Sequence, residues 1–207
     1  MHKQIIQAHA TEIKVPYLLH FTQVVNLRDI MKHGLYPIGR VNEIGVMPAI
    51  NDQKRLDGHR NSTSVSISFP NCEMFYKYRQ IKNETDWVVL ALAPAVLWEK
   101  DCAFCRHNAA SASIKGQPLL KTPDALIGMF EDHASREEQK LKTFDPTDVQ
   151  AEVLVFDVIE PEYVIAAIFE TAAIRDKYAL YLGERKICLN GKDKGMFARR
   201  SYMRKYQ

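Results

Sequence analysis

The segment 149–156, Val-Gln-Ala-Glu-Val-Leu-Val-Phe, constrains the fold more than any other part of the sequence. Its apolar run predicts a buried β-strand, and Glu152 stands at the start of that strand. Side chains two residues apart in a strand project from the same face, so Gln150 and Glu152 address one ligand from a rigid element. A carboxylate at such a place is costly unless something uses it. The alternative is a glutamate at the end of a strand that faces water.

Further apolar segments predict other strands, with helices between them. Residues 64–69 alternate strictly, which places Val65, Ile67 and Phe69 in a core and three serines, ending at Ser68, on a face suited to lining a polar cleft. Apolar runs predict strands at 17–21, 87–92, 164–169 and 186–189. Periodic spacing predicts helices at 22–34, 74–79, 123–130 and 172–182, the first capped by Thr22 and ended by Gly34.

Three segments predict connections instead. Residues 36–63 are rich in glycine, proline and polar side chains without clear periodicity, and loops of that length are usually functional or disordered. Residues 104–117 and 135–146 also predict loops. Helix and strand therefore alternate, but irregularly.

Length and composition predict one globular domain spanning 1–207. The chain of 207 residues lacks the change of composition that marks a linker, and its 46% apolar and 26% charged residues are typical of soluble proteins. No run approaches the roughly 20 apolar residues of a membrane span. The first residues lack the continuous apolar core of a secretory signal. We therefore expect a cytoplasmic protein that does not bind a membrane.

The four cysteines are too sparse for a disulfide framework, so we expect reduced thiols. Cys102 and Cys105 form a CxxC pair with His107 nearby. A zinc site of this kind needs a second ligand pair at comparable spacing, and the sequence offers none. We therefore expect no metal.

Positive charge is concentrated at the C-terminal end. Residues 171–207 contain 10 Lys and Arg against 3 Asp and Glu, a charge of +7, although the whole chain carries +3. The cations are interleaved with Phe197, Tyr202 and Tyr206, a mixture suited to phosphate neutralisation and base stacking. The candidate nucleic-acid ligands here are Lys192, Lys194, Arg199 and Arg200. The alternative is a solvated terminal segment.

Several common catalytic motifs are missing from the sequence. It has no GxGxxG turn, P-loop, HExxH helix or GxSxG elbow, which argues against Rossmann dehydrogenases, P-loop triphosphatases and the commonest hydrolases. The remaining polar candidates at strand ends and loops are His20, Thr22, Arg55, Ser68 and Glu152. Together they supply a hydrogen-bonding group, a phosphate-directed cation and a carboxylate, which suits a ligand with hydroxyls and phosphates. Taken singly, a satisfied buried histidine and a solvated loop arginine are the competing interpretations.

Four features in this order resemble one known family. They are Leu19-His20-Phe21-Thr22 with Asn26-Leu27 and a helix ending in Gly34, an arginine-bearing loop, Pro70-Asn71-Cys72-Glu73-Met74 after a strand, and Gln150-Ala151-Glu152. Over residues 17–190 the sequence is similar to the DarT family of DNA ADP-ribosyltransferases, the toxins of DarT–DarG toxin–antitoxin pairs. The motifs are short, and their order carries much of the resemblance.

The resemblance implies an α+β ADP-ribosyltransferase fold, with a split β-sandwich core and flanking helices. It implies that NAD is the co-substrate and that ADP-ribose is attached to a base of single-stranded DNA, with a DarG-type antitoxin as partner. Carried over by position, Glu152 and Arg55 are the catalytic residues. His20, Thr22, Asn26, Arg55 and Ser68 are expected to bind NAD, and Gln150 is expected to face the DNA.

Two departures from the family leave the target base open. The aromatic-rich strand of thymidine-modifying members is replaced by the serine-alternating residues 64–69, so guanine competes with thymine. Arg60 competes with Arg55 as the essential loop arginine. Two further functions remain open: the same fold acting on RNA or protein, and a non-catalytic nucleic-acid-binding module.

Overall fold

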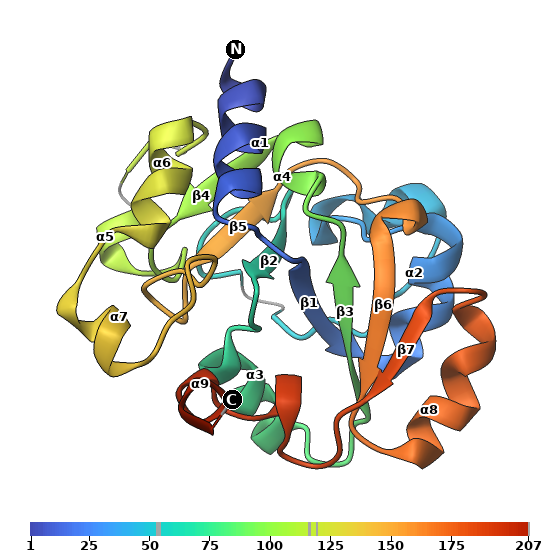
Figure 1. The fold of residues 1–207 in the computed structure, drawn as a ribbon. Helices are drawn as coiled ribbons and strands as arrows, with labels where there is room; N and C mark the ends of the chain where they lie inside the picture. The colour runs from blue at the N-terminus through green and yellow to red at the C-terminus, as the bar shows by residue number, and fades with distance from the viewer. Residues whose placement is uncertain (53–54, 116, 119, 207) are drawn as a thin grey trace.

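The computed structural model describes residues 1–52, 55–115, 117–118 and 120–206 (Figure 1). Within them the strands are β1 (Leu18–Gln23), β2 (Thr63–Ile67), β3 (Trp87–Leu92), β4 (Cys102–Cys105), β5 (Glu152–Val155), β6 (Val164–Phe169) and β7 (Lys186–Leu189). The α-helices are α1 (His2–Glu12), α2 (Leu27–His33), α3 (Cys72–Ile81), α4 (Val96–Glu99), α5 (Ala112–Lys115), α6 (Pro123–Ile127), α7 (Ala134–Glu138), α8 (Ala172–Tyr178) and α9 (Arg200–Tyr206). Short 3-10 helices include η1 (Val24–Asn26), η2 (Ile38–Ile44) and η6 (Gly195–Phe197).

The strands form a sheet that divides into two halves at β2. The order is β4-β5-β2-β1-β3-β6-β7, and all neighbours are antiparallel except β6 and β7. The first residues of β2 pair with β5, through Thr63 opposite Val155, whereas its last residues pair with β1, through Ile67 opposite Leu18. The strand thus passes from one half of the β core to the other. This arrangement confirms the predicted α+β fold with a split β core.

Helices cover both faces of the larger half of the sheet, which explains the unbroken apolar run of β3. Val88, Leu90 and Leu92 point into a core with the apolar side chains of α1, α2 and α6. Trp87, Val89 and Ala91 point the other way, where Phe75 of α3 and Phe197 of η6 cover them. Alternate residues of a strand face opposite sides, so a strand buried on both sides carries apolar residues throughout. In Figure 1, α3 and α9 lie together below β2.

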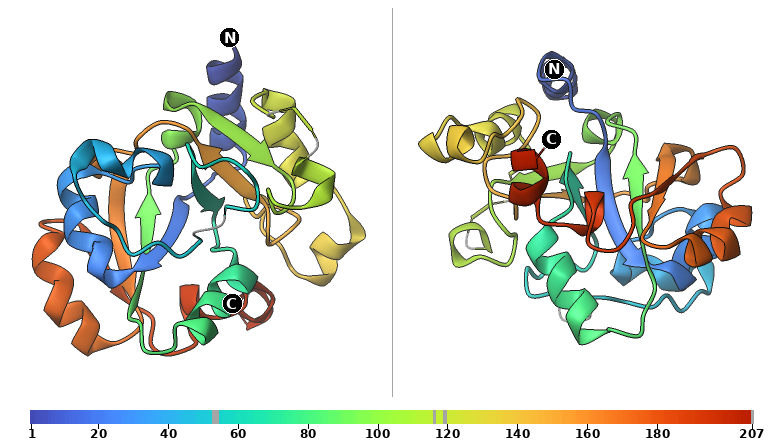
Figure 2. Two further views of the ribbon diagram at one scale, coloured as in Figure 1. Left: turned by 180° about the vertical axis from the view of Figure 1, so that it is seen from behind. Right: turned by 60° about the horizontal axis from the view of Figure 1, so that its bottom comes forward.

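Most predicted elements are present, including the helix that ends at Gly34. That residue has φ of +96°, and a Cβ there would lie 2.6 Å from the carbonyl oxygen of Ile159. Only glycine tolerates this backbone approach without strain. The segment that follows begins with η2 and crosses the sheet, as the rear view in Figure 2 shows.

Several local predictions are wrong. Thr22 lies inside β1, which runs to Gln23, so it does not cap the following helix. Residues 104–117 do not form a loop throughout, because they contain the end of β4 and all of α5. The segment 135–146 includes most of α7. Both missed helices and β4 have four or five residues, too few to show a periodic pattern.

Among the described residues, none of the helices has the length and apolar character needed to cross a membrane.

Candidate active site

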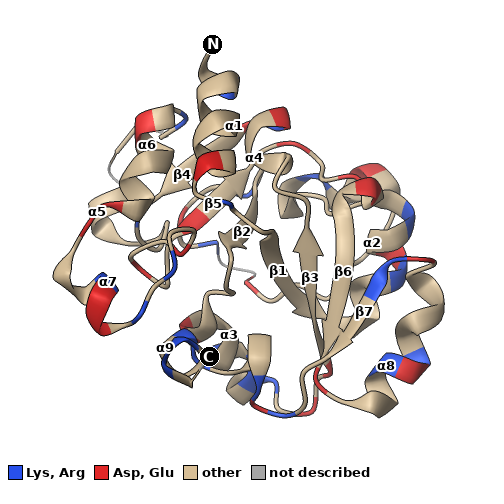
Figure 3. Ribbon diagram, in the orientation of Figure 1, with Lys and Arg blue, Asp and Glu red and all other residues tan. Residues whose placement is uncertain are grey.

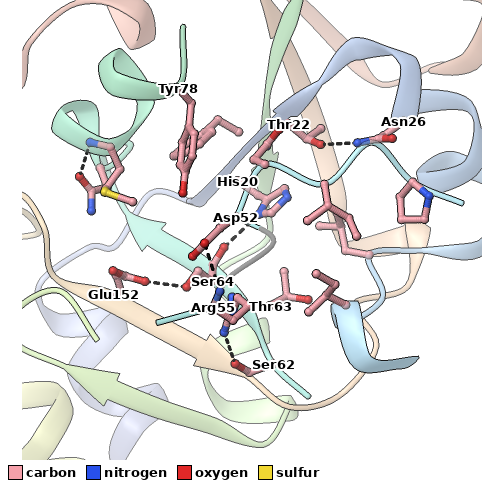
Figure 4. Close-up of a pocket in the computed structure, with 18 of the residues that line it drawn as sticks. His20, Thr22, Asn26, Asp52, Arg55, Ser62, Thr63, Ser64, Tyr78 and Glu152 are labelled. Carbon is pink, nitrogen blue, oxygen red and sulfur yellow. Dashed lines mark hydrogen bonds between the residues drawn. The ribbon is translucent and has the colours of Figure 1, made fainter. Parts of the chain in front are cut away.

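A cavity of about 970 Å³ opens where the two halves of the β core diverge. Its walls come from β1, β2, the start of β5, one face of α3 and the long segment between α2 and β2 (Figure 4). This volume is at the upper end of the range found for small-molecule sites. The cavity therefore accommodates a ligand the size of a dinucleotide.

Glu152 stands in the wall of this cavity, at the first position of β5. Its Oε2 accepts a hydrogen bond of 2.6 Å from the hydroxyl of Ser64 on the neighbouring strand β2, and its Oε1 lies 3.4 Å from the backbone nitrogen of Ala109. Burial raises the pKa of Glu152 above its ordinary range, while the bond from Ser64 opposes the rise. The competing interpretation, a strand-end glutamate facing bulk water, does not describe this carboxylate.

His20 reaches the same wall from β1. Its Nδ1 lies 2.9 Å from the backbone oxygen of Ser64. A carbonyl oxygen only accepts hydrogen bonds, so Nδ1 carries the hydrogen and Nε2 of the neutral ring is left as an acceptor. Burial lowers the pKa of His20, which favours this neutral form. His20 is thus oriented by the same residue whose side chain holds Glu152.

Arg55 lines the cavity from the long segment between α2 and β2, with φ of +41°. Its Nη2 lies 2.8 Å from a carboxylate oxygen of Asp57 and donates to the backbone oxygen of His59 and the hydroxyl of Ser62. Its Nε is buried and has no hydrogen-bond partner in the described part of the chain. Arg60, the predicted competitor, is not among the lining residues. The guanidinium is therefore held through its Nη2, while its Nε has no hydrogen-bond acceptor among the described residues.

Asn26 and Thr22 both line the cavity and are joined to each other. The Asn26 amide nitrogen donates to the Thr22 hydroxyl at 2.9 Å and to the backbone oxygen of Ala49 at 3.0 Å, and its oxygen accepts from the Ala49 nitrogen at 2.8 Å. The Gln23 amide nitrogen donates to the side-chain oxygen of Asn51, and the Lys82 ammonium donates to the backbone oxygen of residue 50. These contacts hold the segment before Arg55 against η1 and α3, so Asn26 positions that segment.

Two predicted site residues are buried away from the cavity. Ser68 follows the end of β2, adopts φ of +62° and donates to buried Asp145 at 2.6 Å, so it does not line the cavity. Ser64 and Ser66 line it instead, which confirms the predicted polar serine face in part. Arg200 is 2% exposed and donates to the backbone oxygens of residues 146 and 147, a placement that removes it from any nucleic-acid surface.

The remaining predicted nucleic-acid ligands divide between the cavity and the outer surface. Gln150 lines the cavity and donates to Glu73 at 2.6 Å. Lys192, Lys194 and Arg199 are exposed, outside the cavity lining, and precede α9 in the chain. Of these four residues, only Gln150 therefore lines the cavity.

Tyr78 is a cavity residue that the sequence did not reveal. Met74, Lys77, Tyr78 and Ile81 all line the cavity, and their spacing of three and four residues places them on one face of α3. Burial is the main cause that raises the pKa of Tyr78 to about 12, so its hydroxyl stays a hydrogen-bond donor. The same helical spacing also suits a core face, which is why the sequence pattern alone did not single it out.

No cluster of three or more His, Cys, Asp or Glu side chains suited to a metal occurs among the described residues. Cys102 and Cys105 are buried in β4, opposite β5. The cavity instead presents a carboxylate, a neutral imidazole, a guanidinium and a phenol. These groups suit a ligand with hydroxyl and phosphate oxygens.

A family model described as "ssDNA thymidine ADP-ribosyltransferase, DarT" matches residues 19–196. The chain belongs to the DarT family. It is therefore an NAD-dependent DNA ADP-ribosyltransferase, and the resemblance noted in the sequence is confirmed. No curated protein matches the chain.

Solved DarT structures share the fold. Thermus sp. 2.9 DarT in complex with ADP-ribosylated ssDNA aligns with a TM-score of 0.61 and 12% identity, over 85% of this chain and 94% of that one. The same DarT in complex with NAD+ aligns with a TM-score of 0.58 and 13% identity, over 85% of this chain and 96% of that one. Thermosipho africanus DarTG in complex with ADP-ribose aligns with 0.56 and 12%, over 87% of this chain and 50% of that longer one.

Proposed function

We propose that this DarT protein transfers ADP-ribose from NAD to thymine in single-stranded DNA, and that the reaction takes place in the cavity around Glu152. The observation that carries the proposal is the Glu152 carboxylate itself. It is partly buried in the wall of a dinucleotide-sized cavity and held by Ser64, which also orients His20. A group buried with a perturbed pKa beside such partners is typical of a catalytic residue.

The cavity offers partners that NAD would satisfy. Arg55 Nε and Thr63 Oγ1 are buried atoms of lining residues, without a hydrogen-bond partner among the described residues. Leaving a buried polar group unpaired costs roughly 1–3 kcal/mol, and the phosphates, hydroxyls and carboxamide of NAD supply the missing acceptors and donors. Arg55 is the cation for the diphosphate, and His20 Nε2 is the acceptor for a ribose hydroxyl.

Glu152 acts on the ribose and on the attacking base. When the bond between nicotinamide and ribose breaks, nicotinamide leaves with the electron pair and positive charge develops on the ribose, as in glycoside hydrolysis. A carboxylate close to that charge stabilises it. A ring nitrogen of the base then bonds to the anomeric carbon and loses its proton, which the same carboxylate accepts. Each role requires the ionised form of Glu152.

The family description supports thymine as the target base, because it names thymidine. Guanine is the competing base, because residues 64–69 alternate serines with apolar residues, whereas the resemblance to the family implies an aromatic-rich strand in thymidine-modifying members. The preference for a single strand has a physical reason: flipping a base out of a duplex costs a few kcal/mol that a single strand does not require. In this proposal Gln150, which lines the cavity, contacts the entering base.

We also propose that the protein is the cytoplasmic toxin of a toxin–antitoxin pair, with a DarG-type protein that removes ADP-ribose as its partner. The similarity to a structure named DarTG supports this role. A DarG-type partner would restore the unmodified oligonucleotide, and an unrelated hydrolase would not.

The test is to incubate the protein with NAD and, separately, single-stranded DNA, duplex DNA of the same sequence, RNA and a protein mixture. We expect nicotinamide release and one added ADP-ribose on single-stranded DNA, at thymine, and no product with Glu152→Ala. An adduct on RNA or protein alone would transfer the proposal to that substrate. Salt-dependent DNA binding without nicotinamide release would show a non-catalytic module instead.

A further inference from the structure

The helix α9 has two faces of different chemistry. Arg200 and Arg204, four residues apart, both point inward. Arg204 makes two bonds of 2.7 Å to Asp145, which is fully buried and also accepts from Ser68. Hydrogen bonds from Arg204 and Ser68 lower the pKa of Asp145, although its burial acts in the opposite direction. These contacts fix α9 to the chain that leads into β5.

The opposite face of α9 carries aromatic rings and cations that the fold does not use. Tyr202 and Tyr206 are 57% and 68% exposed, and their ring centroids lie 4.9 Å apart. Arg199, directly before the first residue of α9, and Lys205 are also exposed, and the lysine Nζ lies 5.7 Å from the centroid of the Tyr206 ring. We call these four side chains the tyrosine face of α9. Exposed paired tyrosines contribute little to a core, so another role explains them better.

The N-terminal end of α9 lies close to residues that line the cavity. Arg200 bonds the backbone oxygen of Thr147, and Asp148 accepts from the backbone nitrogen of Gln150, which lines the cavity. Arg200 also lies close to Cys72, the first residue of α3. Burial raises the pKa of Cys72, and a hydrogen bond to the Arg200 backbone and the charge of Arg200 oppose that rise. Figure 1 shows α9 beside α3, and Figure 3 shows Lys and Arg along it. The start of α9 therefore lies close to the part of the cavity wall that Gln150 forms.

We propose that the tyrosine face of α9 binds the single-stranded DNA that flanks the target nucleotide. Its rings stack on bases, and Arg199 and Lys205 neutralise phosphates. Single-stranded nucleic acid is bound in general by such combinations of aromatic platforms and cations. Two acidic side chains near Gln150, Glu73 and Asp148, face the path of the DNA phosphates, but both already have polar partners. Gln150 donates to Glu73, and His107 contacts Asp148. This inference rests on the proposed function and adds the path of the strand outside the cavity.

The first experiment measures binding without NAD, by the fluorescence anisotropy of a labelled oligonucleotide long enough to extend beyond the cavity. For the double variant Tyr202→Ala/Tyr206→Ala we expect affinity to fall about tenfold or more, from the loss of base stacking. Tyr76→Ala is the matched control, because Tyr76 is a half-exposed tyrosine on α3 outside the cavity lining. All three proteins should unfold at the same temperature, since the substituted rings are exposed.

Salt dependence separates the stacking from the charge contribution. The double tyrosine variant should keep the wild-type slope of log affinity against log salt. Arg199→Ala/Lys205→Ala should make that slope shallower by about 0.7 for each phosphate that the variant no longer neutralises. A steep change of slope in the tyrosine variant, or none in the cation variant, would overturn the assignment of these roles.

Turnover distinguishes this inference from the proposed function. With a short oligonucleotide confined to the target nucleotide and its immediate neighbours, the tyrosine variant should keep the wild-type kcat and KM for NAD. With the long oligonucleotide its KM for DNA should rise about tenfold. If wild type modifies DNA but the variant matches Tyr76→Ala on both lengths, only the present inference fails. If wild type modifies no DNA at all, the proposed function fails, and this inference with it.

Discussion

Replacing Glu152 by glutamine is the sharpest perturbation of the cavity. It removes the negative charge and the base while keeping the size and shape of the side chain. General base catalysis contributes roughly 10²- to 10⁴-fold, and stabilisation of the ribose cation disappears as well. We therefore expect ADP-ribosylation of DNA to fall at least about 100-fold, which corresponds to about 2.7 kcal/mol of transition-state stabilisation.

The same substitution should barely change stability. The carboxylate accepts one short bond, 2.6 Å from Ser64, and one long contact, 3.4 Å from the Ala109 nitrogen. Glutamine keeps an oxygen for Ser64, so the loss is the difference between a charged and a neutral bond, about 1 kcal/mol. Removing a buried charge, whose cost is visible in the raised pKa of Glu152, offsets that loss. The unfolding temperature should shift by less than about 4 °C.

The assay combines the mass of a single-stranded oligonucleotide after incubation with NAD and a thermal unfolding curve for each variant. Glu162→Gln is the matched control, because this glutamate is exposed and does not line the cavity. If Glu152→Gln kept activity within tenfold of the control, the assignment of the carboxylate would be refuted. If it lost activity together with its fold, the low stability cost inferred from the two contacts would be wrong.

Four further outcomes are expected. Activity should fall on acidification with a midpoint above the ordinary glutamate pKa of about 4.3, because only ionised Glu152 is active. Ser64→Ala should move this midpoint higher, because it removes a hydrogen bond that favours the carboxylate. A pH–rate profile of each protein measures both effects. Arg55→Lys should raise the KM for NAD about tenfold or more, because lysine cannot reproduce the guanidinium contacts, as nicotinamide-release kinetics will show. Asp145→Asn should cost roughly 3 kcal/mol by leaving Arg204 without its carboxylate, a difference in unfolding free energy that is present above pH of about 3.9 and disappears as pH falls through the lowered pKa of Asp145.

The sequence was informative where the hydrophobic pattern is long and where a polar residue breaks it. Strict alternation placed Val65 and Ile67 in the core, and the structure buries both. The carboxylate within an apolar strand identified Glu152 as unusual, and its place in the cavity wall, hydrogen-bonded to Ser64, supports that interpretation. The function of Glu152 could be predicted only together with residues from distant parts of the chain, because a cavity brings together residues that no local periodicity connects.

The errors arose where tertiary contacts override the local pattern. Alternation predicted Ser68 on the polar face, but the strand ends one residue earlier and a positive φ turns this serine toward Asp145. Arg200 was grouped with the exposed cations by charge alone, whereas its position four residues before Arg204 places both on the buried face of α9. Charge counts along a sequence do not distinguish the two faces of a short helix.

The most direct test of the account is to digest an oligonucleotide, modified by the wild-type protein with NAD, to nucleosides and fragment the adduct by mass spectrometry. The account predicts one ADP-ribose on a ring nitrogen of thymidine, formed on the single strand and not on its duplex, and absent with Glu152→Gln. An adduct on guanosine would contradict the proposed base. An unmodified oligonucleotide, under conditions in which the protein is folded, would contradict the proposed reaction itself.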